Sequence, residues 1–284
     1  MECTQTRAIR PDPARVGRRY RADMATYLDA IVARHRAEAE ADTRSTGGLM
    51  AAAEELPPTR GFRAALAAAT DLAVIAEVKR RSPSKGDLFA DLDPAVLAAD
   101  YQAAGATCLS VLTDAESFGG SIDDLVAARA AVELPVLRKD FTVSANDVCD
   151  ARLMGADCVL LIVAALSDGE LDEYSSLATQ IGLDVLVEVH DEAEMERALA
   201  QTAGDLIGVN QRDLVTFAVD QARAVRVSAS MPADTVRVAE SGVRGRHDAL
   251  ALAAAGFHAV LVGEHLVTAP DPAAALAALR MPRP

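Results

Sequence analysis

The feature that most constrains the fold is a regular succession of short apolar runs and longer alanine-rich stretches. Eight runs recur, roughly 20–35 positions apart. Each is apolar throughout, which is typical of parallel strands covered on both faces. Eight strand–helix units in one domain predict an α/β fold, a single (β/α)8 TIM barrel. The runs cover residues 73–78, 107–112, 135–137, 158–163, 184–189, 206–209, 236–238 and 259–262.

The segment before the first run predicts an N-terminal addition to the barrel. Residues 27–39 show helical periodicity. Residues 1–23 carry six arginines, and Pro11 and Pro13 should break any helix there. We therefore expect residues 1–23 to be a disordered basic extension. Residues 24–284 should form one catalytic barrel domain with an N-terminal helix.

The composition excludes several classes of protein. The net charge of −14 argues against a nucleic-acid-binding protein, which usually carries a basic stripe. No apolar run reaches the roughly 18–20 residues of a membrane span. The four cysteines form no C-x-x-C pair, and the histidines lack metal-ligand spacing. We expect a cytoplasmic protein without a metal site, a monomer or weak homo-oligomer that binds neither nucleic acid nor membrane.

Charged side chains follow the runs at the end where a barrel has its active site. Glu77 and Lys79 end the first run, Lys139 the third, Glu188 the fifth and Glu240 the seventh. In a partly buried pocket these groups must pair, or their pKa values shift. Such shifts make a glutamate a general base and a lysine a general acid near neutral pH. The pattern therefore predicts acid–base catalysis.

Serine and glycine follow the last two runs, as Ser241-Gly242 and Gly263-Glu264. Barrel enzymes commonly hold a phosphate group at this place with backbone N–H groups. The sequence therefore predicts a small phosphorylated substrate.

Residues 75–86, IAEVKRRSPSKG, resemble the signature segment of the indole-3-glycerol-phosphate synthase family. That family converts 1-(2-carboxyphenylamino)-1-deoxyribulose 5-phosphate to indole-3-glycerol phosphate, CO2 and water in tryptophan biosynthesis, without metal or organic cofactor. The resemblance covers roughly residues 27–275. It continues in order through residues 109–114, 118–121, 135–141, 160–165, 186–190, 207–214, 239–243 and 260–263.

The resemblance implies a catalytic role for each charged residue. Lys139 would be the general acid that protonates the substrate carbonyl. Glu188 would be the general base and would stabilise the cationic intermediate. Lys79 would bind the carboxylate or phosphate end and is a candidate acid for the dehydration. Glu77 and Glu240 would hold the lysines and a substrate hydroxyl or amine.

The resemblance also implies three groups of substrate-binding residues. Asn210 and Arg212 would shape the anthranilate end, and Phe118 and Leu161 would line the apolar ring pocket. The phosphate cradle would consist of Ser82, Ser241, Gly242, Gly263 and Glu264. Position 264 departs from the family, since many relatives have Ser there. If its backbone N–H binds phosphate, its carboxylate must point away.

Three alternatives remain open. Another phosphate-binding barrel, phosphoribosylanthranilate isomerase, needs a Cys/Asp pair, and no strand-end Cys is well placed here. A Schiff-base lyase would use Lys79 or Lys139 as nucleophile. A non-catalytic binding scaffold should have lost some charged strand ends, and all of them are present.

Overall fold

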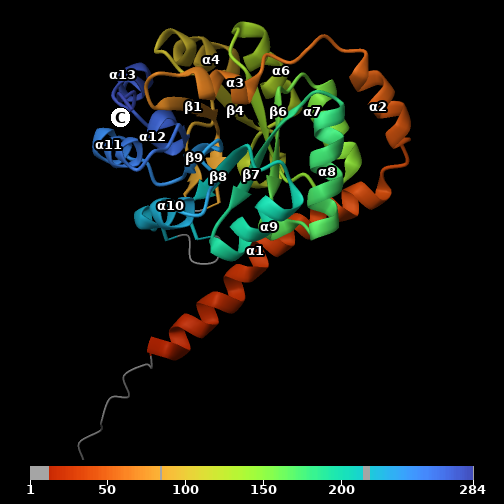
Figure 1. Cartoon of the computed structure of the whole chain (residues 1–284), viewed down its shortest axis with the longest axis horizontal. Helices are drawn as coiled ribbons and strands as arrows, with labels where there is room; N and C mark the ends of the chain where they lie inside the picture. The colour runs from red at the N-terminus through yellow and green to blue at the C-terminus, as the bar shows by residue number, and fades with distance from the viewer. Residues whose placement is uncertain (1–12, 84, 214–217, 284) are drawn as a thin grey trace, which may run out of the picture.

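Eight parallel strands close into a barrel (Figure 1). The computed structural model describes residues 13–83, 85–213 and 218–283. The first strand pairs with the last, Val74 opposite Val260, and this pairing closes the ring. The predicted (β/α)8 barrel is confirmed. Its strands are β1 (Ala73–Val78), β4 (Cys108–Leu112), β5 (Val136–Lys139), β6 (Cys158–Ile162), β7 (Asp184–Val189), β8 (Leu206–Asn210), β9 (Val236–Glu240) and β10 (Ala259–Val262).

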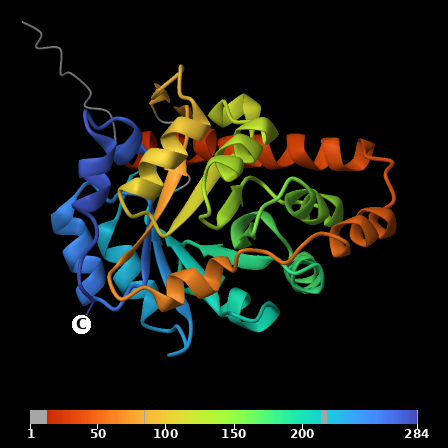
Figure 2. The same ribbon diagram turned by 90° about the horizontal axis from the view of Figure 1, so that it is seen from above.

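Helices surround the strands (Figure 2). Several begin at a side-chain cap; Ser167 and Glu170, for example, form a reciprocal capping box. The helices after the first strand are α4 (Pro94–Ala103), α5 (Ala115–Phe118), α6 (Ile122–Ala131), α7 (Ala145–Leu153), α8 (Asp168–Gln180), α9 (Glu192–Gln201), α10 (Gln221–Ser228), α11 (Arg246–Ala254), α12 (Glu264–Val267) and α13 (Pro272–Ala277). A small hairpin of β2 (Arg81–Ser82) and β3 (Gly86–Asp87) follows β1, and the 3-10 turn η1 (Val163–Ala165) follows β6.

Side chains along each strand alternate between the barrel interior and the layer under the helices. In β6, Cys158, Leu160 and Ile162 belong to the interior cluster. Val159 and Leu161 belong to the cluster beneath the helices. This alternation decides which strand residues can reach the site.

Helix α3 (Phe62–Ala68) closes the amino-terminal end of the barrel. Its Phe62 and Leu66 are fully buried in the interior cluster. The backbone N–H of Arg60 donates to Asp157 Oδ1 at 2.7 Å, just before β6. These contacts close the end of the barrel opposite to the predicted site.

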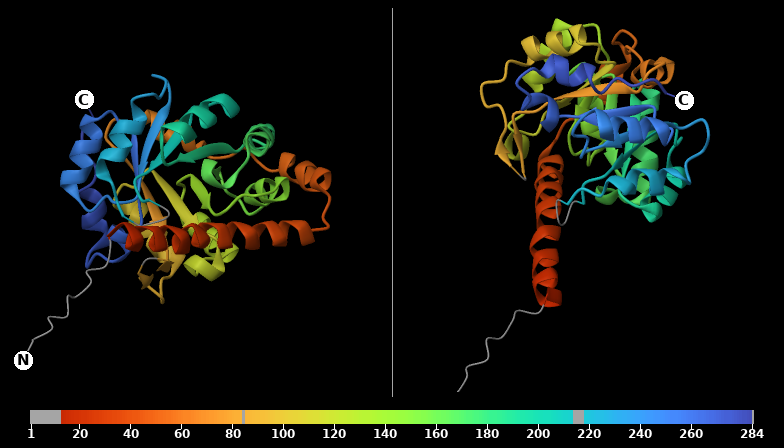
Figure 3. Two further views of the ribbon diagram at one scale, coloured as in Figure 1. Left: turned by 90° about the horizontal axis from the view of Figure 1, so that it is seen from below. Right: turned by 90° about the vertical axis from the view of Figure 1, so that its left-hand side faces the viewer.

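Helix α1 (Pro13–Ala41) lies across the carboxyl-terminal end of the barrel, and a loop leads from it to α2 (Thr46–Glu54) (Figure 3). His35 Nε2 lies 3.0 Å from Asp114 Oδ2, after β4, and Arg36 Nη1 donates to Glu170 Oε1 at 2.6 Å. These contacts hold α1 against the loops that follow the strands.

Helix α1 begins earlier than the periodicity of residues 27–39 predicts. Pro13 takes the first helical position, where its fixed φ suits a helix and its missing N–H needs no partner. It therefore begins the helix rather than preventing it. Residues 1–12 lie outside the described residues, so the predicted basic extension stays a prediction.

No helix within the described parts of the chain is long and apolar enough to cross a membrane.

Candidate active site

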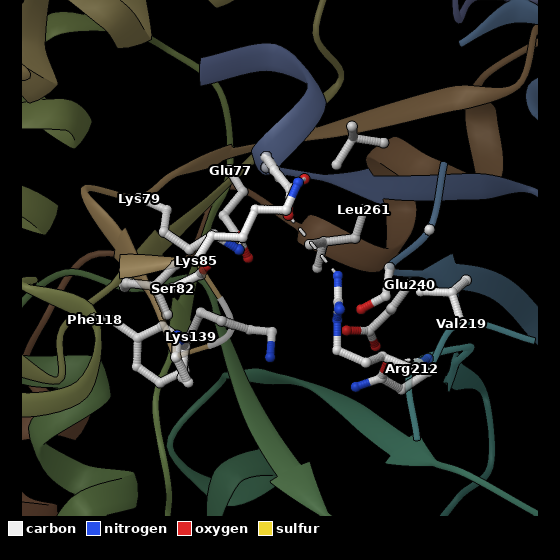
Figure 4. A pocket seen from close by; sticks show the side chains of 18 of the residues that line it. Glu77, Lys79, Ser82, Lys85, Phe118, Lys139, Arg212, Val219, Glu240 and Leu261 are labelled. Carbon is white, nitrogen blue, oxygen red and sulfur yellow. Dashed lines mark hydrogen bonds and ion pairs between the residues drawn. The ribbon is translucent and has the colours of Figure 1, made fainter. Parts of the chain in front are cut away.

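A cavity of about 470 Å³ opens at the carboxyl-terminal end of the strands. It brings together every predicted site residue except Leu161. Figure 4 shows side chains from opposite walls of the barrel pointing into it. The predicted residues that line it are Glu77, Lys79, Ser82, Phe118, Lys139, Glu188, Asn210, Arg212, Glu240, Ser241, Gly242, Gly263 and Glu264.

The first charged pair stands at the end of β1. Glu77 is buried on the interior side of the strand, and Lys79 Nζ lies 2.7 Å from its Oε1. Ser110 Oγ donates to Glu77 Oε2 at 3.5 Å. The hydrogen bond from Ser110 fixes the Glu77 carboxylate, and the ion pair then keeps the Lys79 ammonium at the cavity wall.

The second charged pair joins β5 and β7. Lys139 Nζ lies 3.3 Å from Glu188 Oε2, and Asn210 Nδ2 donates to Glu188 Oε1 at 3.1 Å. Burial alone would lower the pKa of Lys139, but the carboxylates around it outweigh burial and raise the pKa above its ordinary value. Burial alone would raise the pKa of Glu188, but Lys139 and His190 lower it overall. The pair is therefore charged on both sides.

Glu240 is the third buried carboxyl of the cavity. Burial first, and repulsion from Glu188 second, raise its pKa well above the ordinary value. Its Oε1 is buried and has no hydrogen-bond partner among the described residues. Of the two neighbouring carboxyl groups, Glu240 therefore holds its proton to a higher pH than Glu188 does.

Two glycines make room for the carboxyl groups, Gly208 within β8 and Gly263 directly after β10. A Cβ at Gly208 would collide with Glu240 Oε1, and a Cβ at Gly263 would collide with Glu77 Oε1. Any larger residue at either position must displace a carboxyl group of the cavity.

The opposite wall carries backbone and cationic groups suited to an anion. Ser241 has a φ of 64°, rare for a residue with a side chain, and Gly242 has a φ of 73°. Gln211 Nε2 holds this turn by donating to the carbonyl of Ser241 at 2.8 Å. Such strained turns concentrate at functional sites.

The Glu264 carboxylate does not point away from the cavity cations. It forms an ion pair with Lys85 Nζ, and its Oε2 lies 3.9 Å from Arg212 Nη2. The Glu264 side chain therefore shares the anion side of the cavity with two basic groups.

The placement of Leu161 is a correction. Leu161 is fully buried beneath the helices, and its neighbour Ile162 lines the cavity. Side chains alternate along a strand, so the inward face of β6 belongs to Ile162.

Sequence reasoning missed three contributions to the site. Helix α1 supplies Tyr27, Leu28 and Ile31 to the cavity wall, and the hairpin after β1 supplies Lys85. The periodicity of residues 27–39 predicted a helix with an apolar face, but it did not predict that this face lines the cavity. The third is His190, which is buried with Nε2 3.4 Å from Glu188 Oε1.

One cluster among the described residues has the donor set of a metal site: His35, Asp114 and Asp140. Both carboxylates already have cationic partners, because Arg34 pairs with Asp114 and Arg138 with Asp140. The cluster does not line the cavity, and we assign it to anchoring α1.

Comparison with known proteins finds close relatives. The family model described as indole-3-glycerol phosphate synthase matches residues 28–279. A protein of that name from Rhodospirillum rubrum is 51% identical over 232 residues, 81% of this chain and 88% of the relative. Another from Mycolicibacterium gilvum is 48% identical over 257 residues, 90% of this chain and 94% of the relative.

A solved structure supports the fold alone. Thiamine phosphate pyrophosphorylase from Pyrococcus furiosus superposes with a TM-score of 0.55 at 16% identity. The match covers 73% of this chain and 93% of that one.

Proposed function

Because this chain belongs to the indole-3-glycerol phosphate synthase family, an enzyme family of tryptophan biosynthesis, we propose how its cavity performs the reaction. The substrate is 1-(2-carboxyphenylamino)-1-deoxyribulose 5-phosphate. The chain acts on it as a carboxy-lyase and releases CO2 and water as indole-3-glycerol phosphate forms. The predicted cytoplasmic location and monomeric or weakly oligomeric state belong to the same proposal.

Lys139 and Glu188 carry the ring closure. The ring carbon that bears the carboxylate attacks the carbonyl carbon, a C–C bond forms, and the carbonyl oxygen takes a proton from Lys139. The nitrogen lone pair feeds this attack, so positive charge develops on the substrate nitrogen. The raised pKa of Lys139 keeps this group protonated before the attack, although the shift is opposite in direction to the lowering expected of a lysine that acts as an acid near neutral pH. The lowered pKa of Glu188 keeps an anion beside the developing cation.

Loss of CO2 and then of water completes the sequence. The C–C bond to the carboxylate breaks, and its electron pair neutralises the iminium. The new hydroxyl then takes a proton from Lys79 and leaves as water. Glu188, as the general base, removes a proton from the neighbouring CH2 carbon, and the electron pair of that C–H bond forms the indole double bond. Glu77, 2.7 Å from Lys79, orients that second acid.

The remaining cavity residues bind the two ends of the substrate. The strained turn of Ser241 and Gly242, together with Gly263, Glu264 and Ser82, offers N–H and hydroxyl groups to the phosphate. Asn210 and Phe118 bind the anthranilate end, and Arg212, whose Nη2 lies 3.9 Å from Glu264 Oε2, reaches from that end to the phosphate. Ile162 takes the ring-pocket place predicted for Leu161.

One observation carries the proposal: the ammonium of Lys139 and the carboxylate of Glu188 lie 3.3 Å apart in one cavity. Acid-assisted attack on a carbonyl requires a proton donor, and an anion beside it stabilises the developing cation.

The test is conversion of the substrate in the presence of EDTA, followed by indole fluorescence. The chain contains no Trp, so the protein adds little background. We expect conversion by the wild type and loss of at least about a hundredfold in Lys139→Ala and Glu188→Gln. Conversion that survives in Lys139→Ala would assign the main acid elsewhere, first to Lys79. No indole from folded wild type would reject the proposal, and borohydride trapping would then test the Schiff-base alternative.

A further inference from the structure

The chain contains only three lysines among its 28 Lys and Arg residues, and all three line the cavity. Two of them, Lys79 and Lys139, have places in the proposed reaction. Lysine is a compact point charge and arginine a broad planar one, so the two are not interchangeable. All the Lys and Arg residues of the chain other than these three are arginine, so the lysine at position 85 indicates a place where a compact ammonium group is needed.

Lys85 and Arg212 share one counter-ion. Lys85 forms an ion pair with Glu264 Oε1, and Arg212 Nη2 lies 3.9 Å from Glu264 Oε2. In Figure 4, Lys85 reaches across the cavity toward the side on which Arg212 lies. A single carboxylate therefore offsets part of the charge of two cations from opposite walls.

The Lys85–Glu264 pair is accessible to water. The Lys85 side chain is 59% exposed and that of Glu264 is 30% exposed. Pairs of this kind contribute little to stability, because water screens them. A phosphate dianion has more charge and more acceptor oxygens than a carboxylate, so it can replace Glu264 as the partner of both cations.

We propose that Glu264 competes with the substrate phosphate for Lys85 and Arg212, and that this competition sets the affinity of the enzyme. The proposal rests on the proposed function, which places the phosphate at this wall. Lys85 is then a phosphate-binding residue, and the carboxylate at position 264 is an internal competitor.

The first experiment measures the Kd for inorganic phosphate by calorimetry in the wild type and in Glu264→Gln. The substitution keeps the shape and removes the charge. We expect phosphate to bind about threefold to tenfold more tightly in Glu264→Gln, because two cations lose their competitor. Lys85→Met should weaken binding by a similar factor. In the Lys85→Met background, Glu264→Gln should tighten phosphate binding by a smaller factor than it does in the wild type, because one of the two cations is already absent.

Two controls separate competition from other effects. Glu196→Gln removes one charge from an exposed position on α9, and we expect its Kd to match the wild type within about twofold. Amine acylation followed by mass spectrometry should show that phosphate protects Lys85. Unchanged or weaker phosphate binding in Glu264→Gln, with the fold intact by circular dichroism, would overturn the proposal.

Kinetics with the substrate distinguish the failure of this proposal from that of the proposed function. In Glu264→Gln we expect KM to fall about threefold to tenfold, because Glu264 acts at the phosphate end. If the wild type forms indole and KM does not fall, the competition alone is rejected. If the wild type forms none while Glu264→Gln binds phosphate more tightly, the competition stands and the reaction is rejected.

Discussion

Glu188 and Glu240 are buried neighbours in the cavity whose pKa values shift in opposite directions. Lys139 and His190 stabilise the charge on Glu188, whereas burial and the charge of Glu188 itself disfavour charge on Glu240. The same residue type thus has a lowered pKa at one position and a raised pKa at the other. This division of roles is common where titratable groups have contrasting environments.

Glu240→Gln tests whether the pKa of Glu240 is raised in the folded protein. The folded-state pKa of Glu240 is raised, so the folded protein holds this proton longer than the unfolded chain does. Wild-type stability from this group is complete below the unfolded pKa and falls by about 1.4 kcal/mol per pH unit up to the folded pKa. Glutamine does not titrate, so the stability advantage of Glu240→Gln over wild type should grow with pH in that window. Urea unfolding across the pH range measures it, and a pH-independent difference would contradict the assignment.

Leu161→Ala and Ile162→Ala form a matched pair of substitutions on one strand. Leu161→Ala should reduce the free energy of unfolding by about 2–5 kcal/mol with KM nearly unchanged, since it leaves a cavity beneath the helices. Ile162→Ala should raise KM, because Ile162 lines the site. Denaturant unfolding and steady-state kinetics on both variants would settle the assignment. The reverse pattern would restore Leu161 to the ring pocket.

For single residues, the sequence predicted which charged side chains lie at the strand ends. It did not predict which side chains within a strand face the barrel interior. Glu77, Lys139, Glu188 and Glu240 could be placed because a charge that ends an apolar run must lie at a barrel mouth. Leu161 was misplaced because every residue of its run is apolar. Without alternation, nothing in the run shows which face is inward, and an error of one residue reverses it.

Strand β8 shows how an element can serve the site by lacking a side chain. Gly208 leaves the space that Glu240 occupies from the neighbouring strand β9. Gly208→Ala should therefore displace the Glu240 carboxyl and reduce kcat by at least about tenfold. Gly169→Ala on α8 is the control, since a Cβ there meets nothing within 4 Å. Steady-state kinetics check the result, and equal activity in the two variants would show that β8 adjusts without disturbing Glu240.

The strands were the most predictable elements, because parallel strands buried on both faces leave uninterrupted apolar runs. The hairpin of β2 and β3 was not predictable, since its strands are two residues each and carry no periodicity. That hairpin nevertheless places Lys85. The start of α1 was also missed, because proline occurs both in the first turn of a helix and in segments that are not helical.

In the whole molecule, one helix seals the amino-terminal end of the barrel and another lies over its carboxyl-terminal end, where the cavity opens. Helix α3 closes the amino-terminal end permanently with buried apolar side chains. Helix α1 covers the other end through polar anchors, and Arg36 and Glu170 are 134 positions apart in sequence. Contacts over that separation leave no local pattern, which is why the sequence predicted the helix but not its place.

Arg36→Met tests whether α1 completes the cavity. Loss of the contacts to Glu170 and the carbonyl of Ala165 should loosen α1 and raise KM about threefold or more, since α1 supplies part of the wall. Hydrogen exchange of residues 27–41 should accelerate. Arg197→Met removes a comparable set of contacts, to Asp168 and two carbonyls, without touching α1. Equal effects of the two substitutions on KM would show that α1 is not part of the binding wall.

The pairing of β1 with β10 has a consequence for how the protein is made. A ribosome releases α1 and β1 early, but one of the two strand partners of β1 is the last strand, and α1 contacts loops that emerge much later. The ring can close only after residues 259–262 have been synthesised, and Lys79 then meets the opposite wall of the cavity. No shorter nascent chain holds the assembled acid and base groups. The appearance of activity during translation would therefore time the completion of the barrel.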